Sequence, residues 1–329
     1  MSVLQRAAII GTGICLPTRI LSNQDLEQMV ETNDEWITER TGIKERRIAA
    51  AEEATVDLAE RAARQALERA GVRAEDLDLI ILATATPDRF VPPAACLVQH
   101  RLGAKNAFAF DLNAACSGFL YGLAVGSQFI NSRSSRYILV IGAETLSRII
   151  DWSDRNTCIL FGDGAGAAVL GPAKEKEGLL SFYMRSDGSG EDLLQVPAGG
   201  SRLPASHQTV AEGLHFIQMK GNEIFKLAVR AMVSSADQAL AEAGLTRADV
   251  DWVVPHQANL RIIWAMTQRL GVDRSKVVIT LDHHGNTSAA SIPLALAEGI
   301  ERGDLQKDQI ILLTGFGAGL TWGSAVLRL

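Results

Sequence analysis

The 329-residue chain has few cysteines, no long apolar segment and no excess of positive charge. Its four cysteines are far apart and form no Cys-x-x-Cys pair, which argues against a zinc ribbon or a disulfide framework. The apolar stretches are shorter than the roughly 20 residues that span a bilayer, and the first residues show no basic region followed by a cleavage site. The net charge of −6 argues against nucleic acid as the main partner. We therefore expect a cytoplasmic protein without a membrane segment.

An internal repeat with an offset of 173 residues is the most informative pattern in the sequence. Matching positions include Asn113 and Asn286, Gly142 and Gly315, and Asp76 and Asp249. Each copy has the order helix, strand, loop, helix, strand. With 47% hydrophobic residues the chain can bury a large core. We interpret residues 1–174 and 175–329 as two related halves.

The hydrophobic pattern predicts alternating helices and buried strands. Apolar residues at positions 58, 62, 66 and 70, followed by Gly71, predict a helix over residues 55–70. Short apolar runs predict strands at 79–84, 137–142, 252–254, 277–281 and 310–314. This alternation predicts an α/β fold with mixed or parallel sheets between helical layers.

Small residues recur every fourth position in two predicted helices at the repeat offset. They are Gly118, Gly122 and Gly126 in the first copy, and Ser291, Ala295 and Gly299 in the second. This spacing places each set on one helix face. We expect the two helices to pack against each other through these faces in the middle of the molecule.

Cys116 is the first candidate for chemistry. It lies in Asp-Leu-Asn-Ala-Ala-Cys-Ser-Gly-Phe (111–119), between a strand-like segment and a predicted helix over 117–130. Unpaired backbone N–H groups and the positive end of the helix dipole favour a thiolate there, and the thiolate is the nucleophile. The alternative is a small buried apolar residue, as most cytosolic cysteines are.

Two further residues complete a set that suits acyl transfer. His256 follows the predicted strand 252–254, and Asn286 is the repeat equivalent of Asn113, close to the nucleophile. If related loops from the two halves meet at the centre, a thiol, an imidazole and an amide come together, as nucleophilic acyl transfer requires. Alone, each has a structural alternative: a buried histidine or a turn asparagine. A papain-type protease uses the same three groups, but the repeat and the absence of a disulfide pattern argue against it.

Four motifs resemble those of the β-ketoacyl-acyl carrier protein synthase III family of thiolase-like condensing enzymes. They are the Cys116 segment, Val-Pro-His-Gln-Ala-Asn (254–259), His-Gly-Asn-Thr-Ser-Ala-Ala-Ser-Ile-Pro (284–293) and Gly-Phe-Gly-Ala-Gly-Leu-Thr-Trp-Gly (315–323). The resemblance covers essentially the whole chain. It implies a five-layered α-β-α-β-α fold built from two duplicated halves, a homodimer, and a catalytic triad of Cys116, His256 and Asn286.

The resemblance also implies the reaction. Cys116 would take the acyl group of a short acyl-CoA, with acetyl-CoA expected, and condense it with malonyl-acyl carrier protein. The products would be 3-oxoacyl-acyl carrier protein, CoA and CO2, the initiating step of type II fatty acid synthesis. His256 and Asn286 would stabilise the enolate, and the backbone N–H groups of Cys116 and Ala318 would form an oxyanion hole. Alternatives are a related acyltransferase of secondary metabolism, making an alkylquinolone or a polyketide starter, and a non-catalytic scaffold, which the complete triad argues against.

Binding residues follow from the same resemblance. CoA is expected at Trp36, Arg40, Arg155, Gly221 and Asn259, as a substrate, with no tightly bound cofactor. The acyl carrier protein is expected at Gln257, Ala258, Asn259, Leu260 and Arg261, with Lys226 and Arg269. The acyl pocket is expected at Phe316, with Phe90 and Val91 capping it across the dimer interface. Since Val91 stands where one family pattern has Phe, a longer acyl pocket is a second hypothesis.

Three other motifs are given no ligand. The glycines of segment 161–170 fit a tight turn into a strand better than a nucleotide loop, because no helix and no Lys-Ser/Thr follows. Gly11-Thr-Gly13 lacks the third glycine of a dinucleotide fingerprint. We expect no metal at Asp282-His283-His284, since adjacent side chains diverge on an extended segment.

Overall fold

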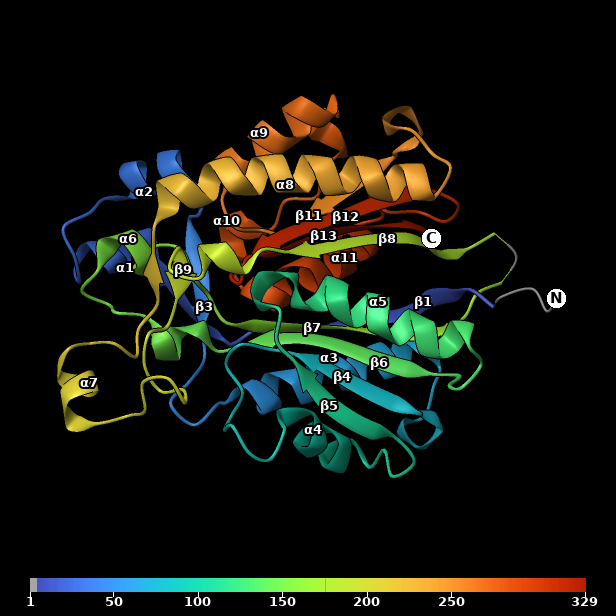
Figure 1. Ribbon diagram of the computed structural model, residues 1–329, viewed down its shortest axis with the longest axis horizontal. Helices are drawn as coiled ribbons and strands as arrows, with labels where there is room; N and C mark the ends of the chain where they lie inside the picture. The colour runs from blue at the N-terminus through green and yellow to red at the C-terminus, as the bar shows by residue number, and fades with distance from the viewer. Residues whose placement is uncertain (1–4, 175) are drawn as a thin grey trace.

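Two sheets and three helical layers are stacked in five layers (Figure 1). The structure, a computed structural model, describes residues 5–174 and 176–329. The first sheet has the order β1 (Ala7–Cys15), β7 (Gly164–Pro172), β6 (Ile138–Glu144), β4 (Leu79–Ala83) and β5 (Phe108–Leu112). The second has the order β11 (Trp252–Pro255), β12 (Ile310–Gly317), β13 (Thr321–Arg328) and β8 (Gly178–Ser186). The five-layered α/β prediction is confirmed.

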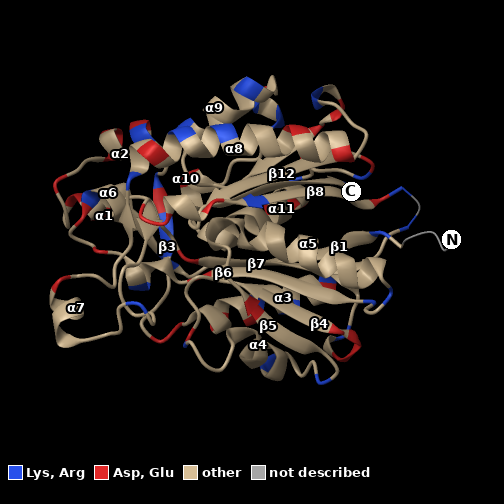
Figure 2. Cartoon of the chain, in the orientation of Figure 1, with Lys and Arg blue, Asp and Glu red and all other residues tan. Residues whose placement is uncertain are grey.

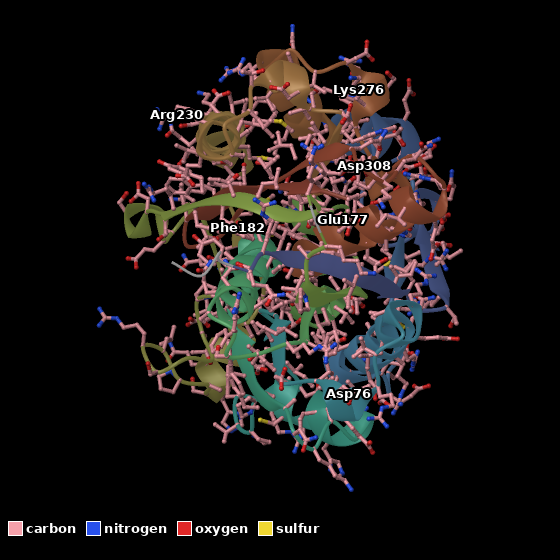
Figure 3. The ribbon with its side chains drawn as sticks, turned by 90° about the vertical axis from the view of Figure 1, so that its right-hand side faces the viewer. Asp76, Glu177, Phe182, Arg230, Lys276 and Asp308 are labelled. Atoms are coloured by element: carbon pink, nitrogen blue, oxygen red, sulfur yellow. The ribbon has the colours of Figure 1, made fainter. Side chains whose placement is uncertain are left out.

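Helices cover the outer face of each sheet and fill the space between them. The outer helices are α3 (Thr55–Ala70) and α4 (Ala94–Leu102) on the first sheet, and α8 (Gly221–Glu242) and α9 (Leu260–Leu270) on the second. The central layer consists of α5 (Gly118–Asn131) and α11 (Ser291–Glu301). From the side, Asp76 near α3 and Arg230 on α8 lie toward opposite ends of the stack, with Phe182 of β8 between them (Figure 3).

Smaller elements gather at one end of the stack, on the left of Figure 1. They include β2 (Arg19–Ser22), α1 (Asn23–Glu27), α2 (Asp34–Thr41), β3 (Glu45–Ile48), α6 (Arg155–Cys158), β9 (Leu194–Gln195), α7 (His207–Ala211), β10 (Gln218–Met219) and α10 (Leu281–His284). No helix in the part of the chain that the structure describes is long and apolar enough to cross a membrane.

The sheets are mixed, as predicted. In the first sheet β4 runs parallel to β5 and β6, while β7 pairs antiparallel with β6 and β1. In the second, β11 and β12 are parallel and the remaining pairs antiparallel. Every strand of the first sheet ends by Pro172, and every strand of the second begins at Gly178 or later. We propose the junction 174/175 as the boundary between the halves.

Helix α3 has the bounds predicted from its apolar spacing. Gly71 ends it in a left-handed conformation with φ of 64°. Its alanine-rich face lies directly on β1, because a Cβ atom on Gly11 would come within 2.5 Å of the Ala66 carbonyl oxygen. Gly11 therefore allows the helix and the sheet to pack closely. The turn into a strand predicted for segment 161–170 is also confirmed, because β7 begins at Gly164.

The predicted contact between the two small-residue faces is wrong. Both helices lie in the central layer, but the glycines of α5 face the first sheet instead of α11. A Cβ atom on Gly122 would lie 2.7 Å from Val140 Cγ1, and one on Gly118 would lie 3.0 Å from Ala83 Cβ. The spacing of these glycines correctly places them on one face of α5. It does not show which element packs on that face, and in the structure this element is the first sheet.

The strand predicted at 277–281 is also wrong. Only a single bridge forms, between Val253 and Val277, and the chain then enters α10. The Gln257 side-chain oxygen accepts hydrogen bonds from the N–H groups of Thr280, at 2.9 Å, and Leu281, at 3.2 Å. A side chain thus replaces the neighbouring strand as hydrogen-bond partner.

His283 and His284 converge where divergence was predicted, because α10 is helical. His283 Nε2 lies 3.2 Å from Glu298, His284 also bonds Glu298, and His283 Nδ1 lies 2.8 Å from Asp282. The hydrogen bonds to Asp282 and Glu298 raise the pKa of His283 to about 9. Burial alone would raise the pKa of Glu298, but the two histidines lower it to about 2.

We expect this cluster to stabilise the fold below neutral pH. A raised folded-state pKa contributes stability that is complete below the unfolded value near 6.5 and is lost as pH rises toward 9. Because the His283 side chain is 35% exposed, solvent screening reduces its contribution to the free energy of unfolding to roughly 1–2 kcal/mol. Urea unfolding at pH 6 and pH 9 measures it: the difference in unfolding free energy between wild type and His283→Gln should shrink at pH 9. An equal difference at both pH values would contradict the role of His283.

Candidate active site

Cys116 lies in a sharp turn between β5 and α5, as predicted. The turn is the 3₁₀ helix η2 (Ala115–Ser117), and the Asn113 side-chain oxygen accepts a hydrogen bond from the Ala115 N–H at 3.1 Å. Ala115 has φ of 46°, a left-handed conformation that few non-glycine residues adopt. Since α5 begins at Gly118, the thiol lies near the positive end of the helix.

Burial opposes the thiolate at this position. Cys116 is 7% exposed, and burial raises the pKa of its thiol to about 12, while the nearby Ser288 side chain acts on this pKa in the opposite direction. The helix terminus therefore does not suffice to ionise the thiol at neutral pH. Attack on a thioester requires a group that accepts the thiol proton.

The second half contains the same turn 173 residues later. It is η7 (Ser288–Ala290), which precedes α11 as η2 precedes α5. The Asn286 side-chain oxygen accepts a hydrogen bond from the Ser288 N–H at 2.9 Å, as Asn113 does in the first turn. Ser288 has φ of 49°, matching Ala115. This turn uses the amide oxygen of Asn286 and leaves the amide nitrogen as a donor.

His256 follows β11 and is buried, with 3% exposure. Its Nδ1 lies 2.7 Å from the Ser291 hydroxyl, at the start of α11. Burial lowers the pKa of His256 to about 3, so the imidazole is neutral at physiological pH. When the Ser291 hydroxyl donates to Nδ1, the proton resides on Nε2, and His256 can donate from there.

The end of β12 approaches the nucleophile at backbone distance. A Cβ atom on Gly317 would lie 2.7 Å from the Cys116 backbone nitrogen, so this position has no room for a side chain. The Thr321 hydroxyl connects the chain before Cys116 with the turn after β12, since it lies 2.8 Å from the Ala114 carbonyl oxygen and 3.0 Å from the Ala318 carbonyl oxygen. Ala318 does not have a positive φ, so an alanine adopts this backbone conformation without strain.

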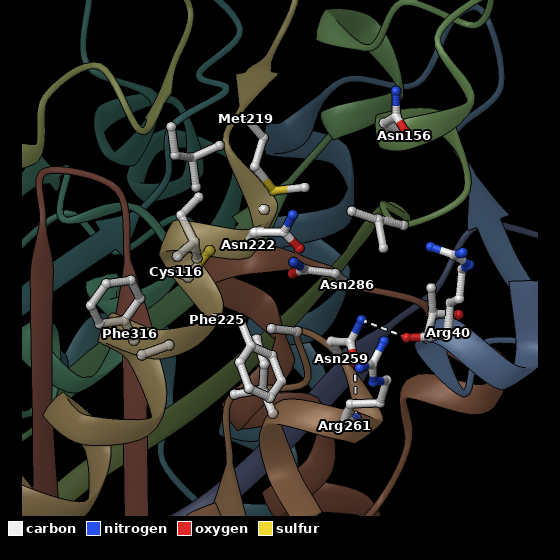
Figure 4. Close-up of a pocket in the computed structure, with 18 of the residues that line it drawn as sticks. Arg40, Cys116, Asn156, Met219, Asn222, Phe225, Asn259, Arg261, Asn286 and Phe316 are labelled. Atoms are coloured by element: carbon white, nitrogen blue, oxygen red, sulfur yellow. Dashed lines mark hydrogen bonds between the residues drawn. The ribbon is translucent and has the colours of Figure 1, made fainter. Parts of the chain in front are cut away.

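One cavity of about 700 Å³ joins these groups. Cys116, His256 and Asn286 all line it. Figure 4 shows Cys116 and Asn286 on its wall, with Arg40 and Asn259 lying beyond Asn286. A thiol, a neutral imidazole and an amide donor in one cavity can take up an acyl group and stabilise an oxyanion.

Two family models match the chain. The model for 3-oxoacyl-[acyl-carrier-protein] synthase III matches residues 110–188, and that for its C-terminal part matches residues 240–329. The β-ketoacyl-[acyl-carrier-protein] synthase III of Caldanaerobacter subterraneus is 56% identical over 322 residues, covering 98% of this chain and 97% of that protein. The chain belongs to the β-ketoacyl-acyl carrier protein synthase III family. It is therefore an enzyme, an acyltransferase of the condensing class.

Solved structures agree with this synthase III assignment. The Aquifex aeolicus synthase III is 48% identical, with a TM-score of 0.91, and the match covers 98% of this chain and all of that one. The priming β-ketosynthase of the R1128 polyketide pathway is 38% identical, with a TM-score of 0.92, covering 100% and 98%. The thiolase-like fold is thus shared.

The residues predicted to bind CoA lie around the outer part of the cavity. Trp36, Arg40, Gly221 and Asn259 line it. Arg155 lies outside the lining, but its guanidinium carbon is 5.1 Å from the centre of the Trp36 ring. The Arg40 guanidinium lies 4.5 Å from the same ring, and the Asn259 amide donates to the Arg40 carbonyl at 3.0 Å.

The residues predicted to contact a carrier protein divide into two groups. Lys226, Ala258, Asn259 and Arg261 line the cavity, whereas Leu260 and Arg269 lie on α9 outside it. The prediction for Gln257 is wrong: it is 1% exposed, and its side-chain amide donates to the carbonyl oxygens of Pro255 and Val278. Lys and Arg residues occur along the outer helices α8 and α9, with acidic residues also present on α8 (Figure 2).

The three predicted acyl-pocket residues lie in different places. Phe316 is 5% exposed and lines the cavity beside Cys116, stacked on Trp322 at 6.4 Å. Phe90 and Val91 are 82% and 81% exposed and do not line it. A single chain therefore does not bring these two residues to the nucleophile.

Sequence reasoning missed the hydroxyls that orient the site. Ser291 was interpreted only as a small packing residue, yet it bonds His256. Thr321 and Ser288 were not singled out, yet the Thr321 hydroxyl donates to the nucleophile turn and the Ser288 hydroxyl donates to Glu144. Isolated Ser and Thr residues in buried segments give no signal in a single sequence.

Proposed function

We propose that this synthase III catalyses the initiating condensation of type II fatty acid synthesis. A short acyl-CoA, with acetyl-CoA expected, reacts with malonyl-acyl carrier protein to give 3-oxoacyl-acyl carrier protein, CoA and CO2. The observation that carries the proposal is the single cavity shared by Cys116, His256 and Asn286, with Trp36 and Arg40 at its outer part.

In the first half-reaction the Cys116 sulfur attacks the acyl-CoA thioester and releases CoA. The tetrahedral oxyanion is bound by the backbone N–H groups of Cys116 and Ala318. The close approach of Gly317 to the Cys116 nitrogen supports this oxyanion hole, because it brings the end of β12 alongside the nucleophile.

In the second half-reaction malonyl-acyl carrier protein loses CO2, and the enolate attacks the acyl-Cys116 carbonyl. His256 Nε2–H and the Asn286 amide donate to the enolate oxygen. A neutral imidazole suits this role, because it already carries a proton on Nε2 and donates a hydrogen bond without taking up a proton from the medium.

CoA binds with its adenine on Trp36. Two guanidinium groups, those of Arg40 and Arg155, lie over the indole ring at 4.5 and 5.1 Å from its centre. An adenine ring entering the stack takes the place of one guanidinium on the indole, so a flat π-system continues to cover Trp36.

Trp36→Ala is expected to raise the KM for acyl-CoA about 5- to 150-fold with little change in kcat, since base stacking contributes about 1–3 kcal/mol. Initial-rate kinetics with acyl-CoA varied at saturating malonyl-acyl carrier protein measure this. Trp264→Ala is the matched control, because Trp264 carries Arg274 at 4.8 Å but does not line the cavity. An unchanged KM in Trp36→Ala would remove Trp36 from the CoA site.

The carrier protein docks at the basic mouth formed by Lys226 and Arg261, with Arg269 farther along α9. An acidic partner is steered to such a surface even on an enzyme of net charge −6. We also propose a homodimer in which Phe90 and Val91 cap the acyl pocket of the other subunit. The 82% and 81% exposure of these two apolar side chains supports it.

A second candidate function is the priming of a polyketide or a related secondary metabolite. The 38% identity to the R1128 priming β-ketosynthase over the whole chain favours it as the alternative. Turnover of malonyl-acyl carrier protein with a panel of acyl-CoA primers separates the two. We expect the highest kcat/KM with acetyl-CoA; a preference for a longer primer would favour the alternative, and no 3-oxoacyl product from any primer would refute the proposal.

A further inference from the structure

Glu144 is a buried acid that the proposed mechanism does not use. It ends β6 and has 0% exposure, and none of the residues that hydrogen-bond it in the described chain is an Arg, Lys or His. A buried carboxyl without a basic partner is costly, so its presence calls for a physical reason.

The hydrogen bonds of Glu144 lead to the nucleophile. The Ser288 hydroxyl donates to Glu144 Oε1 at 3.1 Å, and the Ser288 side chain lies close enough to the Cys116 thiol to act on its pKa. Carboxyl, hydroxyl and thiol thus lie next to one another where the turns η2 and η7 pack together.

The repeat explains how this chain of groups arises. Glu144 is the equivalent of Gly317, 173 residues later, and Ser288 is the equivalent of Ala115. In the second half β12 meets the turn of Cys116; in the first half β6 meets the turn of Ser288, where a Cβ atom on Gly142 would collide with the Ala289 carbonyl oxygen. The two turns pack together at the centre of the molecule.

The groups that face the Glu144 carboxyl are few. The segment after β4 supplies the Thr84 hydroxyl at 3.2 Å, the Ala85 N–H at 3.1 and 3.2 Å, and the Thr86 hydroxyl at 2.5 Å. η7 supplies the Ser288 hydroxyl, and the turn η2, which packs against η7, carries the Cys116 thiol, whose pKa the Glu144 charge raises. Burial raises the pKa of Glu144 to about 7, so its proton can exchange near neutral pH.

We infer that Glu144 holds the proton of Cys116 while the sulfur carries the acyl group, and that Ser288 passes this proton between them. Glu144 acts through Ser288 and is a positioning residue. The inference rests on the proposed function, because it assigns a proton path to both half-reactions.

The proton balance closes over one cycle. During acylation the S–H bond breaks and the S–C bond forms; the thiol proton passes to the Ser288 oxygen while the Ser288 proton passes to the Glu144 carboxylate. The CoA thiolate leaves and takes a proton from water. During condensation the S–C bond breaks, and the Cys116 thiolate regains its proton from Glu144 through Ser288. One solvent proton is consumed per turnover.

The first test measures thiol reactivity without any acyl substrate. The rate of Cys116 alkylation by iodoacetamide, followed by peptide mass, should rise through an inflection near pH 7 in the wild type. Glu144→Gln and Ser288→Ala should lose this inflection and react about 10²-fold more slowly at pH 8. This factor is the lower end of the rate loss that follows removal of a general base. Glu144→Asp should restore part of it.

Asp163→Asn is the matched control. Asp163 is also a carboxyl with 0% exposure and also accepts a hydrogen bond from a serine hydroxyl, that of Ser147 at 2.6 Å, but it has no contact with Cys116. This variant should keep the inflection. Wild-type profiles in both Glu144→Gln and Ser288→Ala, or an equal loss in Asp163→Asn, would overturn the inference.

Two outcomes separate this inference from the proposed function. Normal condensation with unaltered alkylation profiles refutes only the proton path. Absence of any 3-oxoacyl product from the wild-type enzyme refutes the function, while the alkylation profiles still report on Glu144. If circular dichroism shows that Glu144→Gln does not fold, Ser288→Ala decides the outcome, since it removes the hydroxyl and leaves the carboxyl in place.

Discussion

Cys116→Ala is expected to abolish acyl transfer completely. The wild-type chain incubated with acetyl-CoA should gain the mass of one acetyl group, and the variant should gain none. Loss of the nucleophile removes the covalent route, so turnover should fall on the order of 10⁴-fold or more. Intact-protein mass spectrometry with a panel of acyl-CoAs is the measurement.

Cys96→Ala is the control for this experiment. Cys96 lies on α4, its Sγ donates to the Ala109 carbonyl oxygen at 3.7 Å, and it does not line the cavity. Its variant should form the wild-type adduct. An adduct that survives in Cys116→Ala would show that another residue carries the acyl group.

His256→Ala and Asn286→Ala are each expected to lower malonyl decarboxylation about 10²- to 10³-fold, the usual cost of one oxyanion donor. Acylation of Cys116 should remain measurable in both variants. Because burial lowers the pKa of His256 to about 3, its donor form should persist from pH 5 to pH 8, and decarboxylation should show no loss from imidazole protonation in that range. Release of labelled CO2 and the burst of free CoA report the two steps separately.

Asn113→Ala provides a matched control for Asn286→Ala. Both asparagines accept a hydrogen bond from the backbone N–H two residues later, but Asn113 does not line the cavity. Decarboxylation in Asn113→Ala should stay within a fewfold of wild type. Unchanged CO2 release together with failed acylation in His256→Ala and Asn286→Ala would reverse the roles assigned here.

Much of the fold could be predicted because the chain repeats itself. The match of Asn113 with Asn286 predicts that two equivalent turns face each other, and the turns at Ala115 and Ser288 are equivalent in φ and in hydrogen bonding. The apolar spacing predicted both ends of α3 correctly, and Gly71 marks the residue at which the helix stops. The placement of Cys116 before α5 followed from the turn residues around it.

What could not be predicted depends on which neighbour a residue meets. Spacing put Gly118 and Gly122 on one helix face but did not indicate that a sheet covers it. The Gln257 side chain was assigned to the surface, whereas it supplies the hydrogen bonds that a strand would otherwise make. Glu144 gave no signal because a single acid at a strand end is ordinarily exposed; its contact with Ser288 spans 144 positions.

A chase of the acyl-enzyme tests the central claim most directly. Wild-type protein is loaded with labelled acetyl-CoA, freed of excess CoA, and mixed with malonyl-acyl carrier protein. Acyl-Cys116 should disappear as labelled 3-oxoacyl-acyl carrier protein and CO2 appear in equal amounts. A stable acyl-enzyme that transfers no label to the carrier would contradict condensation at Cys116.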